Sequence, residues 1–131
     1  MSILIQPAGS ETVQFPELEL TCTPGTQVGD VVYISGTNAC APALATSTST
    51  MPAIGIVHLK LSPTLCKVTR YGELLGVFSG LVPGLTYFVS KTIPGAMTTT
   101  ITSPAVVHEV GYAVAPNKFA VQIDSDFTIV P

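Results

Sequence analysis

The stretch "GLVPGLTYFVSKTIPGAMTTT", residues 80–100, shows the kind of segment from which this chain is built. It is apolar, contains two Pro-Gly steps and ends in a threonine run, and it holds no acidic residue, histidine or cysteine. Val, Tyr, Phe and Thr fit a pleated, half-buried surface, and Pro-Gly steps mark turns. The stretch therefore predicts a short β-strand between turns and offers no side chains for catalysis.

The same alternation of strand-like segments and turn residues continues along the whole chain. Eleven Gly and eleven Pro punctuate the 131 residues, and no window carries a helical apolar stripe free of proline and β-branched residues. Short strands separated by turns are typical of all-β sandwiches and barrels. We predict an all-β fold, a small β-sandwich or barrel-like domain, with strands at 31–35, 53–59, 67–71, 74–78, 86–90, 107–114 and 119–123 and a tail at 127–130.

The first 25 residues differ from the rest because they carry three prolines, Pro7, Pro16 and Pro24. Proline is tolerated only at the edges and beginnings of strands, so this segment has room for one edge strand near Val13 or Leu18. We predict an extended N-terminal arm over residues 1–25 and a β domain over residues 26–131. The alternative is that the segment supplies the first strand pair of the domain.

The chain also contains an internal similarity. The segment "GDVVYIS", residues 29–35, aligns without a gap with "GLTYFVS", residues 84–90. A hydroxyl-rich cluster, a proline and a strand containing glycine follow in each case, as "AIGIV" at 53–57 and "EVGYAV" at 109–114. Such self-similarity predicts duplication of one strand–loop–hairpin unit. Chance similarity between apolar β sequences is the alternative.

The composition points to protein partners. Charged residues make up 10% of the chain, against about 25% in ordinary soluble domains. A domain of this size exposes much of its surface, and exposed apolar patches mark partner contacts. We therefore predict an obligate oligomer or a subunit of a larger assembly. The alternative is a well-packed monomer with a threonine- and serine-rich surface.

Nucleic acid and membrane are not expected partners. The net charge is −3, and the five basic residues are scattered, whereas nucleic-acid binders cluster them. Glycine and proline break the longest apolar stretch, residues 74–89, so we predict no membrane-spanning helix. The sequence begins without the basic and apolar regions of a signal peptide.

Cysteine usage points to a reducing compartment. Cys22, Cys40 and Cys66 are odd in number and widely spaced, and they form no C-x-x-C pair. A disulfide framework favours an even number. We predict buried free thiols and folding in a reducing cytoplasm.

Residues suited to metal binding or catalysis do not form a recognisable motif. His58 and His108 stand alone, and no spacing joins them to Cys66 or Glu109 as zinc ligands, although a metal shared at a symmetry axis remains an alternative. Ser79 in "GVFSG" is one place late for a nucleophile elbow. We predict no catalytic, metal or cofactor site, and a small hydrolase is the disfavoured alternative.

Two carboxylates, Asp124 and Asp126, alternate in "IDSDF" near the end of the sequence. In a strand they would share one face, where they could bind Ca²⁺ or act in acid–base catalysis. Two solvated charges that protect a sheet edge from unwanted pairing explain them as well. We favour this protective role.

The segments "GELLGVFSGLVPGLTYFVS", "VGYAV" and "FAVQID" resemble a pattern found in structural proteins of tailed bacteriophages. The chain is similar over residues 28–123 to small capsid decoration (cement) proteins and also to tail-fibre domains. The first resemblance implies a homotrimer on the outer capsid surface of a virion, made in the bacterial cytoplasm, that clamps neighbouring major capsid proteins. The second implies a tail-fibre or tail-tip domain that binds a host receptor or glycan. Neither supplies catalytic residues.

An N-terminal arm often makes the capsid contact in proteins of this kind. This points to Ile3, Leu4, Ile5 and Phe15 as capsid or partner contacts, although these positions lie outside the matched segments. An extended arm can add to the sheet or groove of a partner.

Overall fold

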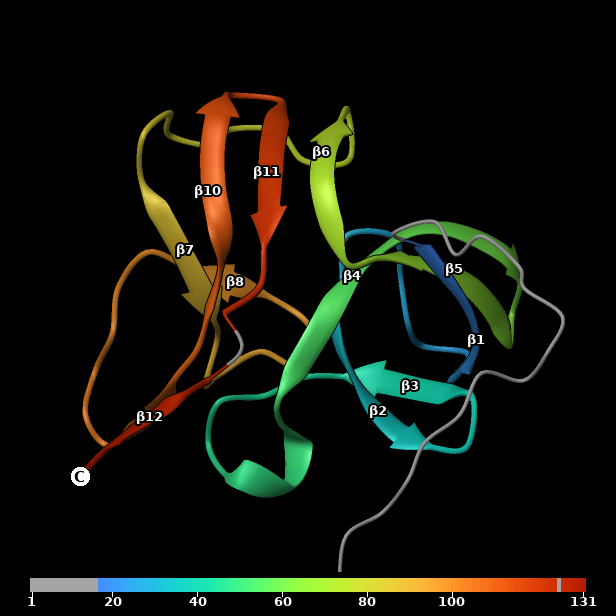
Figure 1. Cartoon of the computed structure of the whole chain (residues 1–131), viewed down its shortest axis with the longest axis horizontal. Coiled ribbons are helices and arrows are strands. Elements are labelled where there is room, and N and C mark those ends of the chain that lie inside the picture. Colours follow the sequence, from blue (N-terminus) through green and yellow to red (C-terminus); the bar gives the residue numbers. More distant parts are fainter. Residues whose placement is uncertain (1–16, 125) are drawn as a thin grey trace, which may run out of the picture.

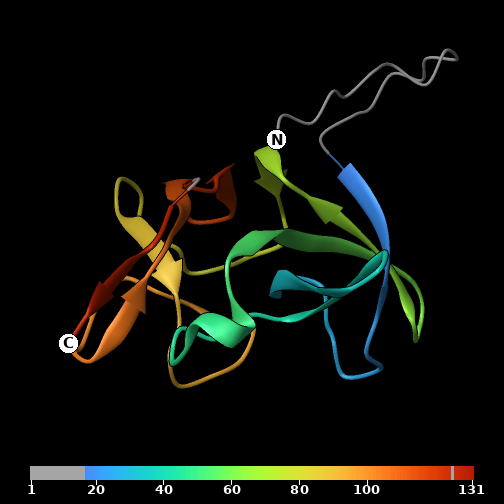
Figure 2. The same cartoon turned by 60° about the horizontal axis from the view of Figure 1, so that its bottom comes forward.

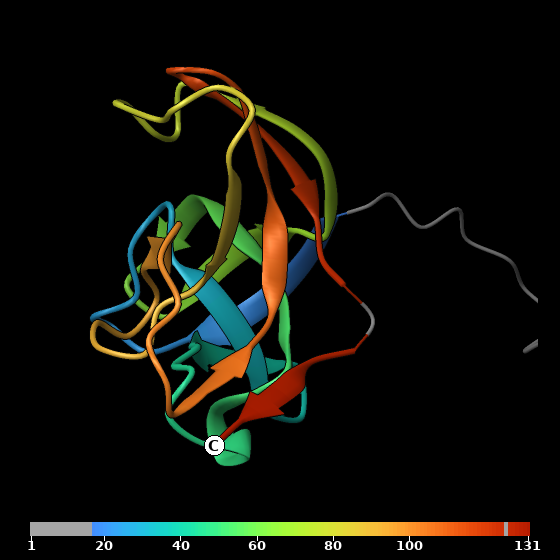
Figure 3. The same cartoon turned by 90° about the vertical axis from the view of Figure 1, so that its left-hand side faces the viewer.

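The computed structural model of the chain describes residues 17–124 and 126–131 (Figure 1). The described part consists of strands, loops and one 3₁₀ turn, η1 (Thr48–Thr50), in which the Ser47 hydroxyl accepts a hydrogen bond from the Ser49 amide. The predicted all-β fold class is confirmed. Figure 3 views the molecule from the side of its second sheet, with the first sheet behind.

The first sheet is a closed five-stranded barrel in the order β1-β3-β2-β4-β5. β1 pairs in parallel with β3, and the other pairs are antiparallel. The strands are β1 (Glu17–Cys22), β2 (Val31–Gly36), β3 (Ala39–Pro42), β4 (Ala53–Ser62) and β5 (Leu65–Thr69).

The second sheet is open and antiparallel, in the order β6-β11-β10-β7-β8. Its strands are β6 (Tyr71–Leu75), β7 (Thr86–Val89), β8 (Met97–Thr98), β10 (Glu109–Ala115) and β11 (Lys118–Gln122). A separate pair, β9 (Ala105–Val107) with β12 (Thr128–Val130), lies at the end of the molecule away from the barrel (Figure 2).

Part of the expected N-terminal arm belongs to the barrel. Glu17–Cys22 forms β1 between β3 and β5, as the alternative interpretation of this segment has it. Pro16 directly precedes the strand, where a missing N–H costs no ladder bond. Residues 1–16 lie outside the described residues, so the division into arm and domain stays a prediction.

The register of strand pairing repeats between the two sheets. Val32 lies opposite Gly55 in the β2–β4 pair, and Tyr87 lies opposite Gly111 in the β7–β10 pair. One residue further on, both pairs shift register by one extra residue on the glycine-bearing strand. These are the segments that the sequence similarity aligns. The structure therefore supports duplication of the unit over chance similarity.

The loop that enters each unit repeats as well. The amide of Gly29 donates to the Val57 carbonyl at 2.7 Å, and the amide of Gly84 donates to the Ala113 carbonyl at 2.8 Å. Both glycines have positive φ, 96° and 87°, a conformation that glycine adopts without steric cost. The same turn therefore begins β2 and β7.

The structural repeat includes a further strand that the sequence comparison did not align. β1 pairs with β5 as β6 pairs with β11, and each pair carries an ion pair at the same place. Glu17 contacts Lys67 at 3.3 Å, and Glu73 contacts Lys118 at 3.0 Å. Each repeat is thus a five-stranded unit, and β9 and β12 are additions to the second one.

Two hydrophobic cores hold the units together. A small core fills the barrel, and a larger one lies between the outer face of β2 and β4 and the inner face of the second sheet. Neighbouring residues alternate between them, because successive side chains in a strand point to opposite faces. Val32 and Val57 belong to the barrel core, and Val31 and Ile56 belong to the larger core; all four are fully buried.

The second unit does not close into a barrel. In the first, β1 and β3 pair at Cys22 and Cys40. The matching residues of the second form no such pair, since Phe78 follows β6 and Met97 lies on the edge strand β8. Larger side chains occupy its inner face, with Phe119 in place of Val68 and Tyr87 in place of Val32.

These aromatic side chains reach the outer face of the first unit. Phe119 is fully buried and forms edge-to-face contacts with Phe78 and Tyr87, whose ring centroids lie 5.6 and 5.7 Å away. Edge-to-face packing favours such pairs beyond the area they bury. The inner face of the second sheet therefore packs on the barrel, and the β6–β8 seam stays open.

Candidate functional site

A groove with a volume of about 540 Å³ lies along the open side of the second unit. It is lined by residues after β6, by residues in and before β8, and by the barrel loop that follows β1. We call it the seam groove and define it by Val77, Phe78, Leu81, Tyr87, Ala96 and Met97 together with residues 27–30 and 93–95. Barrel closure covers the corresponding position of the first unit.

The lining of the seam groove combines apolar side chains with polar groups and one carboxyl group. Among the described residues that line it, Asp30 alone has an acidic or basic side chain. Asp30 accepts a hydrogen bond from the Gln27 amide at 2.9 Å. Burial raises the pKa of Asp30 above its usual value, although the Gln27 hydrogen bond and the Lys60 charge act against the rise. This mixed lining favours an uncharged occupant that offers both apolar side chains and hydrogen-bonding groups.

Large apolar side chains are exposed beside the groove and elsewhere. Ile93 at the groove is 62% exposed, Leu75 on β6 is 70% exposed and Ile129 on β12 is 62% exposed. Tyr71 and Tyr112 are exposed on the second sheet. The composition predicted such a surface, but the sequence alone did not locate it.

His58 lies in a chain of polar contacts on the barrel surface. Its Nδ1 lies 2.6 Å from the Thr69 hydroxyl, and its Nε2 lies 3.0 Å from the Glu17 carboxylate. Lys67 contacts the same carboxylate. No local sequence motif indicates this hydroxyl–imidazole–carboxylate set, because its members come from β5, β4 and β1. The set joins three strands, and it has the order of groups found in nucleophilic enzymes.

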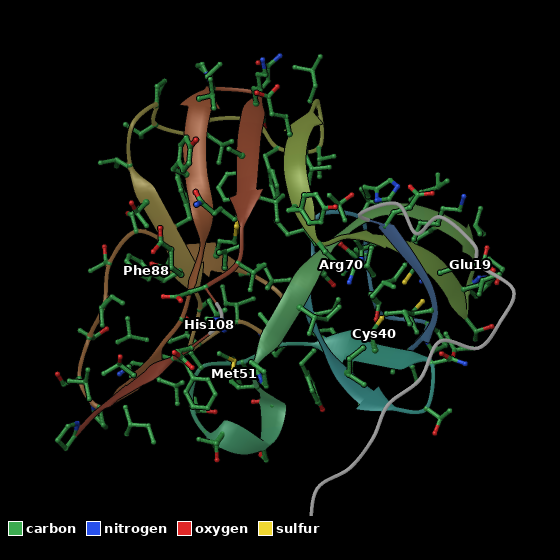
Figure 4. All side chains as sticks on the ribbon, in the orientation of Figure 1. Glu19, Cys40, Met51, Arg70, Phe88 and His108 are labelled. Carbon is green, nitrogen blue, oxygen red and sulfur yellow. The ribbon has the colours of Figure 1, made fainter. Side chains whose placement is uncertain are left out.

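His108 has a structural position at the junction of the two units (Figure 4). It is fully buried, its Nδ1 accepts from the Ala53 amide at 3.2 Å, and its Nε2 donates to the Asp124 carbonyl at 2.8 Å. An amide can only donate and a carbonyl can only accept, so these partners fix the neutral tautomer. His108 thereby connects the start of β4 to the segment after β11.

The three cysteines are buried free thiols, as predicted. Cys40 and Cys66 face each other across the barrel interior with sulfur atoms 3.7 Å apart, and Cys22 lies opposite Cys40 in the β1–β3 pair (Figure 4). Burial raises the pKa of the Cys40 and Cys66 thiols. They pack as small apolar residues, since a thiol with a raised pKa is a weak nucleophile.

The two carboxylates near the end of the sequence are not strand neighbours. β11 ends at Gln122, and the Asp124 side chain accepts from the Asp126 amide at 3.3 Å in the loop that follows. Asp124 therefore shapes a loop, and the expected placement of the two carboxylates on one face of a strand is wrong. Within residues 17–124 and 126–131, no group of three or more His, Cys, Asp or Glu side chains is placed to bind a metal ion.

The predicted contact residues Ile3, Leu4, Ile5 and Phe15 all lie outside the described residues. In the part of the chain that the structure covers, no helix is long and apolar enough to cross a membrane. Comparisons with protein-family models, with curated proteins and with solved structures found no match.

Proposed function

We propose that this chain is a virion structural protein that binds the outer surface of a bacteriophage capsid as a decoration protein. It acts as a homotrimer, clamps neighbouring major capsid proteins and has a structural, non-enzymatic role. Its site of action is the capsid surface, and it is made in the host bacterial cytoplasm. The observation that carries the proposal is the number of large apolar side chains exposed on a charge-poor surface.

The exposed side chains support this function through their position as well as their number. Leu75, Tyr112 and Ile129 lie on different strands of the second unit, so no single small contact covers them. Exposed apolar surface of this extent is typical of proteins that bind other proteins. A clamp between capsid subunits covers several such faces at once. The buried free thiols fit a protein that folds in a reducing cytoplasm.

Co-sedimentation tests the proposal. The purified chain is mixed with empty capsids of the virus that encodes it, and the pellet is assayed for the chain at increasing concentration. Saturable binding at a fixed ratio to the major capsid protein is expected. A chain that stays in the supernatant would contradict the capsid role. Gold-labelled antibody on intact virions separates the capsid from the tail, and labelling at the tail would favour the receptor- or glycan-binding alternative.

The Thr69–His58–Glu17 set raises hydrolysis as a rival function. Lys67 also binds Glu17, which ties the carboxylate to a surface ion pair. We expect the chain and its His58→Ala variant to hydrolyse p-nitrophenyl acetate at the same rate. A rate that falls on this substitution and follows imidazole titration would support the enzyme.

A further inference from the structure

We infer that the seam groove of one copy binds residues 1–16 of a second copy, so that copies of the chain are joined by their N-terminal segments. The inference deepens the proposed homotrimer and rests on that function for its biological setting. The observations that carry it are the open edge of the second unit, the chemistry of the groove and the direction of β1.

The internal repeat shows that the groove lies where a strand pairing of the barrel has no counterpart in the second unit. In the barrel, β1 and β3 pair directly at Cys22 and Cys40. In the second unit, Phe78 and Met97 hold the matching places and line the seam groove. Within the described residues, β8 pairs with β7 alone and is an edge strand of its sheet. An edge strand can accept an added strand.

The chemistry of the groove matches the N-terminal segment. Its lining combines apolar side chains with polar groups, and Asp30 is its one acidic or basic side chain among the described residues. Residues 1–10, "MSILIQPAGS", contain no acidic or basic side chain. An extended segment would place Ile3 and Ile5 on the same face, toward the apolar lining.

The direction of β1 favours a second copy over the same chain. β1 runs from Glu17, beside Thr69, to Cys22, and the loop that follows reaches the groove at residues 27–30. Glu17 therefore lies at the opposite end of β1 from the loop that lines the groove. Sixteen extended residues span at most about 55 Å, which is long enough to reach a neighbouring molecule.

Two variants separate the donor from the acceptor. Deletion of residues 1–15 removes the N-terminal segment and keeps every described strand. Ile93→Glu places a charge in the groove at a side chain that is 62% exposed, so the fold should tolerate it. Ile129→Glu is the matched control, because Ile129 is also 62% exposed but lies on β12. Native mass spectrometry and sedimentation velocity measure the oligomeric state of each.

We expect the full chain and Ile129→Glu to be oligomers, and the deletion and Ile93→Glu variants to be monomers. Mixing the two monomeric variants should restore complexes that contain both chains, because one keeps the groove and the other keeps the segment. A labelled peptide of residues 1–16 should bind the deletion variant at least tenfold more tightly than the deletion variant carrying Ile93→Glu.

Several results would overturn the inference. The full chain could be a monomer, or the deletion variant could remain an oligomer. The two variants could also fail to form mixed complexes. That third result would place the segment in the groove of its own chain or outside the groove. No capsid is present in these measurements. Failure of the capsid proposal therefore shows in co-sedimentation, and failure of the inference shows here.

Discussion

Gly55 and Gly111 occupy the same place in the two repeats for the same steric reason. A Cβ atom at Gly55 would overlap the Thr69 carbonyl of β5, and one at Gly111 would overlap the Ala120 carbonyl of β11. The strand register also shifts beside both glycines. Glycine in a strand interior usually marks such a bulge or a close approach of another backbone.

Gly55→Ala and Gly111→Ala should both destabilise the fold. The backbone of the next strand must move, which costs about 1–3 kcal/mol for overpacking. Gly111 also has a φ of 158°, so its substitution should cost more than that of Gly55. Chemical denaturation measures the change, with Gly36→Ala as control because a Cβ there meets nothing within 4 Å. Equal stability of all three variants would contradict the close approach.

His108→Ala should destabilise the junction between the units. It leaves the buried Ala53 amide without its acceptor, and an unsatisfied buried donor costs about 1–3 kcal/mol. The matched control is His58→Ala, which removes contacts at the barrel surface and should cost less than about 1 kcal/mol. Thermal denaturation distinguishes the two. A larger loss for His58→Ala would contradict the structural role of His108.

Asp30→Asn should change how stability depends on pH. Burial raises the pKa of Asp30 in the folded chain, so the folded state holds this proton more tightly than the unfolded state does. The stability that Asp30 contributes is complete below its unfolded pKa and is lost as pH rises through the folded pKa. Asparagine can still accept from the Gln27 amide.

The change in the free energy of unfolding caused by Asp30→Asn should therefore depend on pH in a fixed direction. Relative to the unchanged chain, Asp30→Asn should be more stable at pH 7 than at pH 3.5, because only the unchanged chain acquires a buried charge over this range. Urea denaturation at several pH values measures the difference. If the stability of Asp30→Asn relative to the unchanged chain is the same at all pH values, or rises toward low pH, the Asp30 pKa is not raised.

At the scale of elements, the strands that could be predicted were those with continuous Val, Ile, Thr, Tyr or Phe. The segments that became β2, β4, β7 and β11 matched within a few residues. β3 and β8 were missed, because each has at most four residues and gains its order from pairing with a longer strand. β6 began three residues before its predicted start at Leu74, since backbone pairing with β11 extends it.

The seam groove and the His58 contacts could not be predicted from the sequence, whereas most strand positions could. The seam groove joins the loop after β1 to residues near β6 and β8, and the His58 contacts join three strands. No local pattern encodes such long-range placement. One signal was present: the repeat predicted equivalent units, and the exchange of Val68 for Phe119 indicates that their interiors differ in size.

The barrel interior should protect its thiols from reaction. Cys22, Cys40 and Cys66 are all buried, and the raised pKa of the latter two suppresses the reactive thiolate. Ellman's reagent at pH 8 should react slowly with the folded chain and with three thiols per chain in denaturant. Rapid reaction of the folded chain, or one thiol in denaturant, would contradict a closed barrel with free cysteines.

At the scale of the whole molecule, one unit is a closed barrel and the other is an open sheet, so their equivalent outer faces differ in exposure. The first unit is a closed barrel, and its outer face is covered by the second. The equivalent outer face of the second unit remains exposed and carries Tyr112. An exterior of this kind, with few charges, supports a protein that acts through adhesion to other subunits.

Thermal rupture of capsids tests the central claim most directly. Capsids are heated with and without the purified chain, and the temperature of DNA release is recorded. A ligand that binds only the intact shell stabilises it by about 2.7 kcal/mol per site at one hundred times its Kd. We predict a higher release temperature that saturates with the chain's concentration. An unchanged release temperature, with the chain free and monomeric beside the capsids, would contradict the proposed function.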